Sequence, residues 1–480
     1  MSHAKVSIVL GMQFGDEGKG MGVNRLFSSK IISSQYEEVI PSPDVTVRFN
    51  GSAQAAHNVI ANGKHHTFSQ FSSGYLSKIH TTYLHKTFLV SPWDLLDEAF
   101  KLDVKVAHGH AMSTIRIHEE APILLPLYGF VNKLEELSRG ENRHGSCGRG
   151  VGVLAKELAE LGPVLRHKDL TSKEDIFVTL TTIRDKYFEY CKLLLDNINF
   201  NDKSHEERML HDFYYYFNGS FARDYSHWLM NEYYHNVQIV DDTWLTNALG
   251  LSKHVVFEGA QGILLDEWRG FHPHTTWSST NLRVVHDIFE EHEYEGEYHT
   301  YGMVKAFQTR HGAGPFPTED PEYYHHFNDE YNGTGVYQGA FRYGKLDIPL
   351  LRYALKVAKD PGSRYRGIDS LQIACADQIV DAHNSPSDFV PEMVIHYREG
   401  TVPVNLTLTD LNRQSEITKM VSKAKIDTET ILSPEDLYKI DDYLWSNPSF
   451  SHGYETPCVS YVSYSSADVG DSTFYAEYEA

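Results

Sequence analysis

A short strand-like segment followed by a glycine-rich loop constrains this chain more than any other feature. Residues 6–10 (VSIVL) predict a buried strand, and the loop after it holds Asp16, Lys19 and glycines at positions 11, 15, 18 and 20. Glycine lets backbone N–H groups approach a phosphate closely, and the lysine adds a point charge. The loop is not a Walker A motif, because Gln13 and Gly20 stand where that motif needs Gly and Ser or Thr. It predicts a phosphate-binding loop whose Asp16 carboxylate binds Mg²⁺ or takes a proton.

The composition is that of a globular enzyme. The chain has 480 residues and a formal net charge of −22, which argues against a nucleic-acid backbone as a partner. No apolar run approaches the roughly 18 residues that a membrane span needs, and no signal-peptide pattern is present. The 4 cysteines are far apart and form no CxxC pair, so neither a zinc site nor a disulfide framework is indicated. We therefore expect a cytoplasmic protein with no membrane segment.

Segments with strand character alternate with helical segments along the chain. Residues 45–49, 87–90 and 255–257 are further strand candidates, and Ser91-Pro92 predicts a helix start with an N-cap serine. Residues 170–235 predict a helical insertion, and the polar residues 318–340 predict a long functional loop. We expect an α/β fold with a large, mainly parallel central sheet flanked by helices, with helical and loop insertions in a single catalytic domain over residues 1–480.

Residues 11–20 (GMQFGDEGKG) resemble the opening loop of the adenylosuccinate synthetase family, with phenylalanine in place of a tryptophan. The joint occurrence of an Asp-Glu pair and a lysine carries the resemblance, and further segments follow in the family's order. The resemblance implies a homodimeric ligase that uses GTP and Mg²⁺. It also implies nucleotide binding by the loop residues Gly15, Glu17, Gly18, Lys19 and Gly20.

Residues 48–59 resemble the family's next segment, which ends in the histidine that acts as general acid. His57 matches that histidine, and an imidazole suits the role because its pKa lies near neutrality. Gln54 replaces an asparagine that touches the nucleotide, and Ala56 replaces a glycine whose carbonyl contacts Mg²⁺. The resemblance thus implies a substrate contact by Gln54 and a metal site formed by Asp16 and the Ala56 carbonyl.

Residues 146–150 (SCGRG) resemble the loop that binds the substrate 5′-phosphate. The resemblance implies contacts by Ser146, Cys147 and Arg149, although a thiol is a weaker donor than the hydroxyl it replaces. Family members also bring an arginine from a neighbouring subunit, whereas residues 158–163 here contain none. The sequence leaves that subunit-crossing contact open.

Two further segments match almost letter for letter. Residues 257–266 (FEGAQGILLD) place Gln261 at a strand end, where its amide can donate to an oxyanion. Residues 310–319 (RHGAGPFPTE) begin with the substrate-binding candidate Arg310 and have a histidine where the family has valine. Between these segments, Thr276 matches a phosphate contact of the family.

The resemblance weakens where family members hold aspartate with four arginines. Only Arg342 remains here, so Arg342 and Thr334 are the candidates for the amino-substrate site, over which residues 318–340 are expected to order. Asp377 aligns with a guanine-binding aspartate of the family, but the neighbouring lysine is absent. Residues 170–235 and the C-terminal part, 381–480, match poorly. The chain therefore resembles a divergent branch of the family.

The reaction that the resemblance implies has two steps. Asp16 removes the N1 proton of IMP, and the 6-oxygen attacks the γ-phosphate of GTP while His57 hydrogen-bonds the phosphoryl group and Gln261 steadies the oxyanion. The amine of L-aspartate then displaces the 6-phosphoryl group to give adenylosuccinate. The same chemistry with dGMP, with ATP or with another amine stays open. A non-catalytic nucleotide-binding regulator is a further alternative, which the thinned arginine loop supports and the retained acid–base residues oppose.

Overall fold

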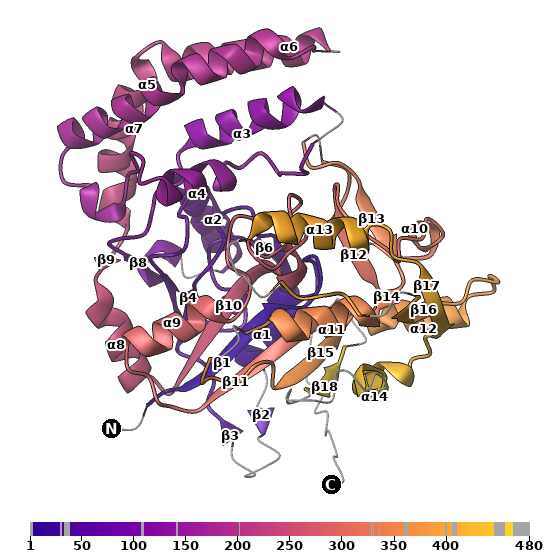
Figure 1. Ribbon diagram of the computed structural model, residues 1–480. Helices are drawn as coiled ribbons and strands as arrows, with labels where there is room; N and C mark the ends of the chain where they lie inside the picture. Colours follow the sequence, from indigo (N-terminus) through magenta and orange to yellow (C-terminus); the bar gives the residue numbers. More distant parts are fainter. Residues whose placement is uncertain are drawn as a thin grey trace.

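The structure is a computed structural model that describes residues 3–28, 31–32, 39–106, 110–140, 143–200, 202–327, 329, 331–335, 337–359, 363–398, 401–405, 410–445 and 457–463. Its centre is a nine-stranded sheet in which neighbouring strands are all parallel (Figure 1). Across the sheet the strands are β18 (Cys458–Val462), β15 (Ser370–Ala374), β11 (Tyr298–Lys305), β1 (Lys5–Gly11), β10 (His254–Gly262), β4 (Val45–Arg48), β7 (Thr81–Leu84), β8 (Ile115–His118) and β9 (Ile239–Val240). The prediction of a mainly parallel central sheet is confirmed.

Four smaller sheets surround the central one. They are the pairs β2 (Ile31–Ile32) with β3 (Val39–Ile40), β5 (His57–Ala61) with β6 (Lys64–Phe68) and β12 (Gln308–His311) with β13 (Phe341–Gly344), and the three-stranded sheet β14 (Leu346–Asp347), β16 (Glu392–Tyr397) and β17 (Ile426–Ile431). Two of the pairs carry predicted site residues, because β5 begins at His57 and Arg310 of β12 lies opposite Arg342 of β13.

Helices cover both faces of the central sheet (Figure 1). They are α1 (Lys19–Ser28), α2 (Pro92–Lys105), α3 (Pro126–Ser138), α4 (Val151–Ala159), α5 (Lys173–Asn197), α6 (Lys203–Phe217), α7 (Ser220–Trp228), α8 (Asp242–Leu251), α9 (Arg283–Glu291), α10 (Tyr323–His326), α11 (Ile348–Val357), α12 (Ala376–Asn384), α13 (Leu411–Val421) and α14 (Ile440–Trp445). The predicted start of α2 at Ser91-Pro92 is confirmed. Among the described residues, none of these helices is both long enough and apolar enough to cross a bilayer.

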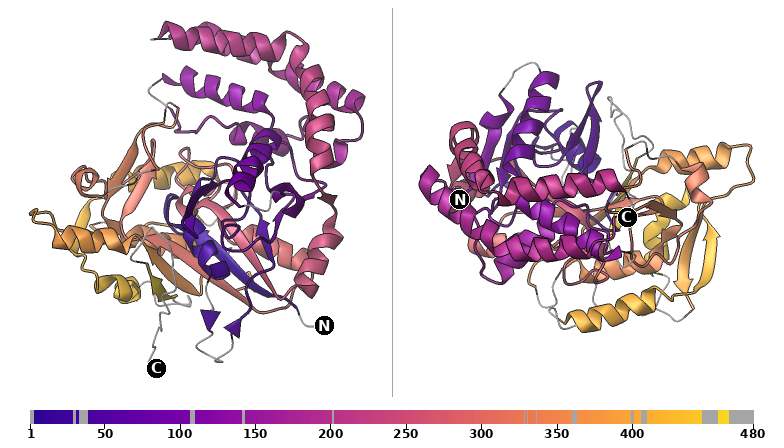
Figure 2. Two further views of the ribbon diagram at one scale, coloured as in Figure 1. Left: turned by 180° about the vertical axis from the view of Figure 1, so that it is seen from behind. Right: turned by 90° about the horizontal axis from the view of Figure 1, so that it is seen from above.

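The residues predicted to form a helical insertion contain the helices α5, α6 and α7. One row of α5 is buried, at Ile176, Leu180, Ile183, Tyr187 and Cys191, and it packs against α3. Spacings of three and four residues place these side chains on one helix face, which explains why the sequence pattern indicated a helix. Figure 2 shows α5 and α6 at one end of the molecule and α14 towards the opposite end.

β1 shows why the opening segment predicted a strand. Its residues from Val6 to Gly11 are all buried, because β10 pairs on one side, β11 pairs on the other and helices cover both faces. A parallel strand covered on both faces reads as a nearly continuous apolar run without polar alternation.

The strand predicted at residues 87–90 is wrong. The strand that pairs with β4 is β7, at Thr81–Leu84. After it the chain turns, with the Phe88 N–H donating to the His85 carbonyl at 2.9 Å, and Val90 makes only an isolated bridge. Phe88 and Val90 are nevertheless fully buried. The apolar run therefore reflects burial in the core, which a four-residue pattern cannot distinguish from a strand.

The first part of the loop predicted at residues 318–340 is packed structure. Tyr323, in the short helix α10, is buried, and the Phe327 ring stacks on the Phe307 ring with centroids 4.3 Å apart. The described residues from 329 to 340 contain no helix or ladder strand beyond a bridge between Gly335 and Gly339. The ordering of this loop over a substrate stays a prediction.

Asn50 ties the loop after β4 to the end of β10. Its amide donates to the carbonyls of Ala260 (3.1 Å) and Ser279 (2.9 Å), and its oxygen accepts the Ala260 N–H (2.8 Å). Asn50 is fully buried, so water does not compete for these bonds. The segment that holds His57 and the segment that holds Gln261 are thereby fixed to each other.

We expect Asn50→Ala to lower the free energy of unfolding by about 2–3 kcal/mol, because it strands buried backbone groups of two loops. Calorimetric unfolding measures the change. The matched control is Asn197→Ala on α5, where an exposed amide makes one local bond and a change within about 0.5 kcal/mol is expected. Equal midpoints for Asn50→Ala and the wild type would show that the bonds do not hold the two loops.

Candidate active site

The predicted site residues gather at the carboxyl edge of the central sheet. The parallel strands β1, β4, β10, β11 and β15 end there, so the loops that follow them meet. A Cβ atom built on Gly18 would lie 3.0 Å from the Ala374 Cβ, which places the glycine-rich loop beside the start of α12 and Asp377. Open parallel sheets bind ligands outside this edge.

Glu17 holds the glycine-rich loop in shape from within. Its carboxylate accepts the backbone N–H groups of Gln13 (2.9 Å) and Gly15 (2.8 Å), and Lys19 Nζ lies 2.6 Å from its other oxygen. Both Glu17 and Lys19 are buried. The predicted nucleotide contact of Glu17 has no support in this geometry, because the side chain faces into the loop.

Glycine is required where the chain encloses this carboxylate. A Cβ atom at Gly11 would lie 2.3 Å from Glu17 Oε2, and one at Gly262 would lie 2.4 Å from Glu17 Oε1. At Gly20 a Cβ atom would lie 2.9 Å from the His57 Cβ. The absence of a side chain at Gly20 therefore lets the start of α1 approach the strand that holds His57.

His57 is oriented by a buried carboxylate. Its Nδ1 lies 2.7 Å from Glu258 Oε1, and Glu258 also accepts the Ser73 N–H (3.1 Å) and hydroxyl. Arg48 lies 3.9 Å from the same carboxylate. Burial raises the pKa of Glu258, but the charge of Arg48 and the hydrogen bonds from His57 and Ser73 outweigh it and hold that pKa at about 2. Glu258 is therefore ionised and fixes the His57 ring.

The other ring nitrogen of His57 has no partner. Burial lowers the pKa of His57, although Glu258 opposes this shift. Among the described residues, His57 Nε2 is buried without a hydrogen-bond partner, as are both amide atoms of Gln54 and the Ser52 hydroxyl. Buried polar groups in native proteins are nearly always bonded, so such a group of unpaired atoms on one segment fits a polar ligand.

Gln261 lies at an irregularity of β10. The register between β1 and β10 shifts between Val9 and Gly11, and Gln261 takes a left-handed backbone with φ 64°. Bulges of this kind re-aim a side chain and occur beside active sites. The structure thus brings Gln261 to the edge where the glycine-rich loop ends.

Asp16 also has a left-handed backbone, with φ 60°, and its side chain is 23% exposed. One of its oxygens lies 3.5 Å from Nε2 of His311. In the same loop, the Gln13 side chain accepts the Lys305 N–H (2.9 Å). Its amide donates to the Lys305 carbonyl (3.2 Å) and to the Gln308 side chain (2.7 Å). The loop is thereby fixed to the end of β11 and the start of β12.

The predicted phosphate loop is anchored on α3. Ser146 donates its hydroxyl proton to the Asn132 side chain at 2.7 Å, and Arg149 pairs with Asp94 at 3.0 Å. Cys147 is exposed. Thr276 is half-buried, and its N–H is bonded to the Leu265 carbonyl at 2.8 Å. The Ser146 hydroxyl also accepts the Gly148 N–H at 3.3 Å.

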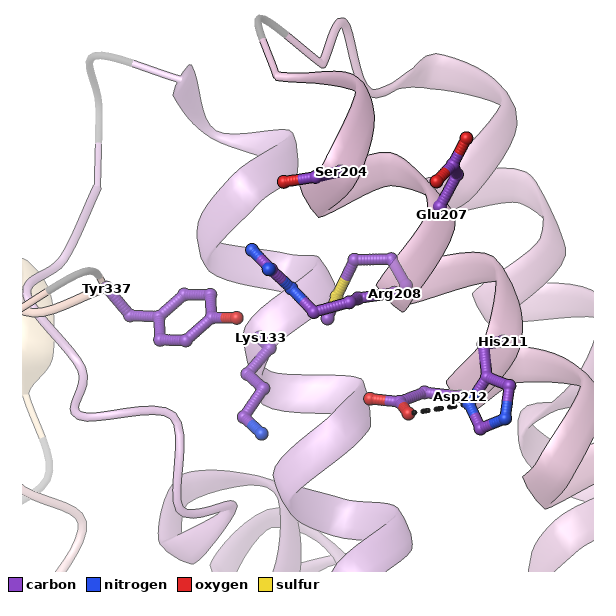
Figure 3. A pocket seen from close by; sticks show the side chains of 8 residues that line it. Lys133, Ser204, Glu207, Arg208, His211, Asp212 and Tyr337 are labelled. Atoms are coloured by element: carbon purple, nitrogen blue, oxygen red, sulfur yellow. Dashed lines mark ion pairs between the residues drawn. The ribbon is translucent and has the colours of Figure 1, made fainter.

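A cleft of about 600 Å³ adjoins this loop (Figure 3). Lys133 of α3, Arg208 and Asp212 of α6 and Tyr337 line it together with Ser204, Glu207, Met209 and His211. A Cβ atom at Gly148 would lie 3.1 Å from Lys133 Cγ and 3.3 Å from a Tyr337 ring carbon, so the cleft touches the phosphate loop from the insertion side.

The two arginine candidates are already engaged. Arg310 is 1% exposed and donates to the carbonyls of Ala313 (3.2 Å), Pro315 (2.9 Å) and His274 (3.1 Å), and burial, with the charge of Arg342, lowers its pKa to about 9. Arg310 therefore braces a turn.

Arg342 directs its fork at Glu319, with Nε 2.8 Å from Oε1 and a second contact to Oε2. Its remaining nitrogen donates to the carbonyls of Gly312 and Gly314, each at 3.0 Å. A substrate carboxylate would compete with Glu319 for this guanidinium. Thr334, the other amino-substrate candidate, is exposed.

Asp377 lies in the first turn of α12, and one of its oxygens is buried without a partner among the described residues. Burial raises its pKa. A carboxylate oxygen left free beside the glycine-rich loop suits a nucleobase edge that offers N–H donors.

The Asp16 side chain is suited to Mg²⁺. Magnesium is usually held by one or two carboxylates together with substrate phosphates. Asp16 offers a partly exposed carboxylate beside a phosphate-type loop, and Ala56, whose carbonyl is the second predicted ligand, is exposed. The donor set therefore fits the ion.

Sequence reasoning missed three of these residues. Glu258 lies inside a matched segment, but its partner His57 is 201 residues away. Lys305 forms a buried ion pair with Asp329 at 3.1 Å, which no motif indicated. His311 was visible only as a difference from the family's valine.

Comparison with known proteins points to one family. A family model for adenylosuccinate synthetase matches residues 8–377. The adenylosuccinate synthetase of Acetivibrio thermocellus is 28% identical over 362 residues, 73% of this chain and 74% of the relative. That of Mesoplasma florum is 30% identical over 390 residues, 77% of this chain and 76% of the relative.

Two solved structures share the fold. A fully ligated adenylosuccinate synthetase from Plasmodium falciparum has a TM-score of 0.66 at 20% identity, with 97% of this chain and 100% of that chain covered. The succinoaminodeoxyadenylate synthetase of cyanophage S-2L, bound to dGMP and to dATP as an energy donor, has a TM-score of 0.50 at 15% identity, with 78% and 85% covered. At these identities both structures bear on the fold alone.

We expect Glu258 to stabilise the folded protein at neutral pH. Because its pKa is about 2 in the folded protein and 4.5 ordinarily, this stabilisation is complete above 4.5 and disappears as pH falls towards 2. The difference in Tm between the wild type and Glu258→Gln should therefore shrink as pH is lowered from about 5 to about 3. Glu290→Gln, at an exposed carboxylate, is the control. A Glu258→Gln difference that stays constant over this range contradicts the ion-pair account.

Proposed function

Because the chain belongs to the adenylosuccinate synthetase family, whose members are ligases that form C–N bonds, we propose that it condenses L-aspartate with IMP to adenylosuccinate, driven by GTP hydrolysis. The observation that carries the proposal is the buried, unpartnered Nε2 of His57, held by Glu258 at the sheet edge where the glycine-rich loop lies. A free imidazole nitrogen beside a phosphate-type loop suits phosphoryl transfer.

In the first step of the proposed reaction, Asp16 takes the N1 proton of the 6-oxopurine. The 6-oxygen then attacks the γ-phosphate and displaces the nucleoside diphosphate. Glu258 accepts the Nδ1–H of His57. Because burial lowers the pKa of His57, the neutral ring has a free lone pair on Nε2, and Nε2 must take up a proton before it donates to the phosphoryl group; the charge of Glu258 favours this imidazolium. Gln261 donates its amide to the 6-oxygen.

In the second step, the amine of L-aspartate attacks C6 and the phosphate leaves with the former 6-oxygen. Mg²⁺, held by Asp16 and the Ala56 carbonyl, would offset the charge of the nucleotide phosphates. Lys19 adds to this positive charge, although it must then share its ammonium between a phosphate and Glu17. Gln54, Ser146, Cys147, Arg149 and Thr276 are proposed to contact the monophosphate nucleotide, and Asp377 the guanine of GTP.

We expect His57→Ala to reduce turnover by about 10²–10⁴, because it removes proton donation to the transferred phosphoryl group. Phosphate release with IMP, GTP and aspartate is the measurement, with His235→Ala, at an exposed histidine after α7, as the control. The same assay with dGMP, ATP or other amines tests the alternative substrates. Near-wild-type turnover of a folded His57→Ala variant would remove His57 from the mechanism.

Arg342 gives a second test, on the amino substrate. Arg342→Lys keeps the charge and loses the fork, so it should raise KM for aspartate and leave KM for the nucleotides unchanged. Glu319→Gln releases the guanidinium from its present partner and should lower the same KM. If neither variant moves KM for aspartate, or if another amine supports faster phosphate release, aspartate is not bound by Arg342.

A further inference from the structure

His311 is a polar residue at the position where the family has valine, whose hydrocarbon side chain makes no polar contact. It is the last residue of β12, directly opposite Phe341 of β13, and the two rings lie 4.6 Å apart. Its side chain is 22% exposed. The ring is therefore held by packing on one face, which fixes where its nitrogens point.

Nε2 of His311 lies between two side chains from different segments. The Asn332 oxygen is 3.1 Å away, within hydrogen-bond distance, and the nearer Asp16 oxygen is 3.5 Å away. Asp16 sits in a left-handed turn, which a residue other than glycine holds only when its surroundings fix it. Among the residues that the structure describes, the ring of His311 is the side chain within ion-pair distance of the Asp16 carboxylate.

The loop that contains Asn332 reaches the same turn by a second route. Asp329 pairs with the buried ammonium of Lys305 at 3.1 Å, and the Lys305 N–H donates to the Gln13 side chain at 2.9 Å. Gln13 belongs to the glycine-rich loop that holds Asp16. Asp329 and Asn332 are thus joined to that loop, the first through Lys305 and the second through His311.

We propose that His311 is a positioning residue for Asp16, which couples the segment 329–335 to the carboxylate that takes the N1 proton. The inference rests on the proposed function, because it assigns a role to a neighbour of the proposed base. As a consequence, the base Asp16 and the loop over the amino-substrate site reach their working positions together. Of the family's four arginines at the amino-substrate site, only Arg342 remains here. The contact of His311 with Asn332 gives this chain an additional way to fix the loop.

Steady-state kinetics of four variants tests the coupling. His311→Val and Asn332→Ala should each lower kcat by about 10- to 100-fold, because displacing a catalytic base by about 1 Å slows turnover by that factor. KM for IMP should change less than about threefold. His311→Gln keeps an N–H donor and should recover most of kcat. The double variant should be no slower than the slower single variant, because both changes break one connection. His325→Val, at an exposed histidine of α10, is the matched control.

Hydrogen exchange of residues 331–335 in the ligand-free protein gives a readout that needs no activity. His311→Val should speed exchange there, and His325→Val should not. Wild-type kcat in His311→Val, losses that multiply in the double variant, or unchanged exchange would each overturn the coupling. If the wild-type protein releases no phosphate with any substrate set, the proposed function fails and the exchange result alone decides the coupling.

Discussion

The buried carboxylate of Glu258 is the group on which the arrangement of the site depends. It is an ionised side chain in the middle of the central strand β10, and burying such a charge is costly unless it is paired and hydrogen-bonded. Arg48, His57 and Ser73 supply those partners. Because β10 lies between β1 and β4, the same strand that fixes His57 also carries Gln261 next to the glycine-rich loop.

The glycine-rich loop is shaped by a carboxylate of its own. Glu17 takes the backbone N–H groups and the lysine charge that such loops otherwise offer to a phosphate. A nucleotide must therefore bind through other N–H groups or draw Lys19 from Glu17. The buried Gln13, bonded to both Lys305 and Gln308, keeps the loop in register with β11 and β12 during such a change. The loop is thus preformed, which reduces the entropy lost on binding.

Much of this arrangement was predictable, for identifiable physical reasons. Strand β1 and the buried row of α5 carry their periodicity in the sequence, and matched segments located His57, Asp16 and Gln261. The strand predicted at residues 87–90 was wrong, because a short apolar run that is buried without pairing in a sheet has the same sequence pattern as a strand. Contacts between residues far apart in the sequence could not be predicted, so no role was assigned to Glu258. The ion pair between Arg342 and Glu319 was not predicted either, although Arg342 was a candidate and Glu319 ends a matched segment.

The central claim is that the 6-oxygen of the purine nucleotide leaves as part of the released phosphate. It is tested most directly with IMP labelled with ¹⁸O at position 6, together with GTP, Mg²⁺ and L-aspartate. The account predicts that each phosphate released carries one ¹⁸O atom, detected by mass spectrometry, in step with formation of the C–N bond. Phosphate released without the label, or C–N bond formation with the label recovered in water, would contradict it.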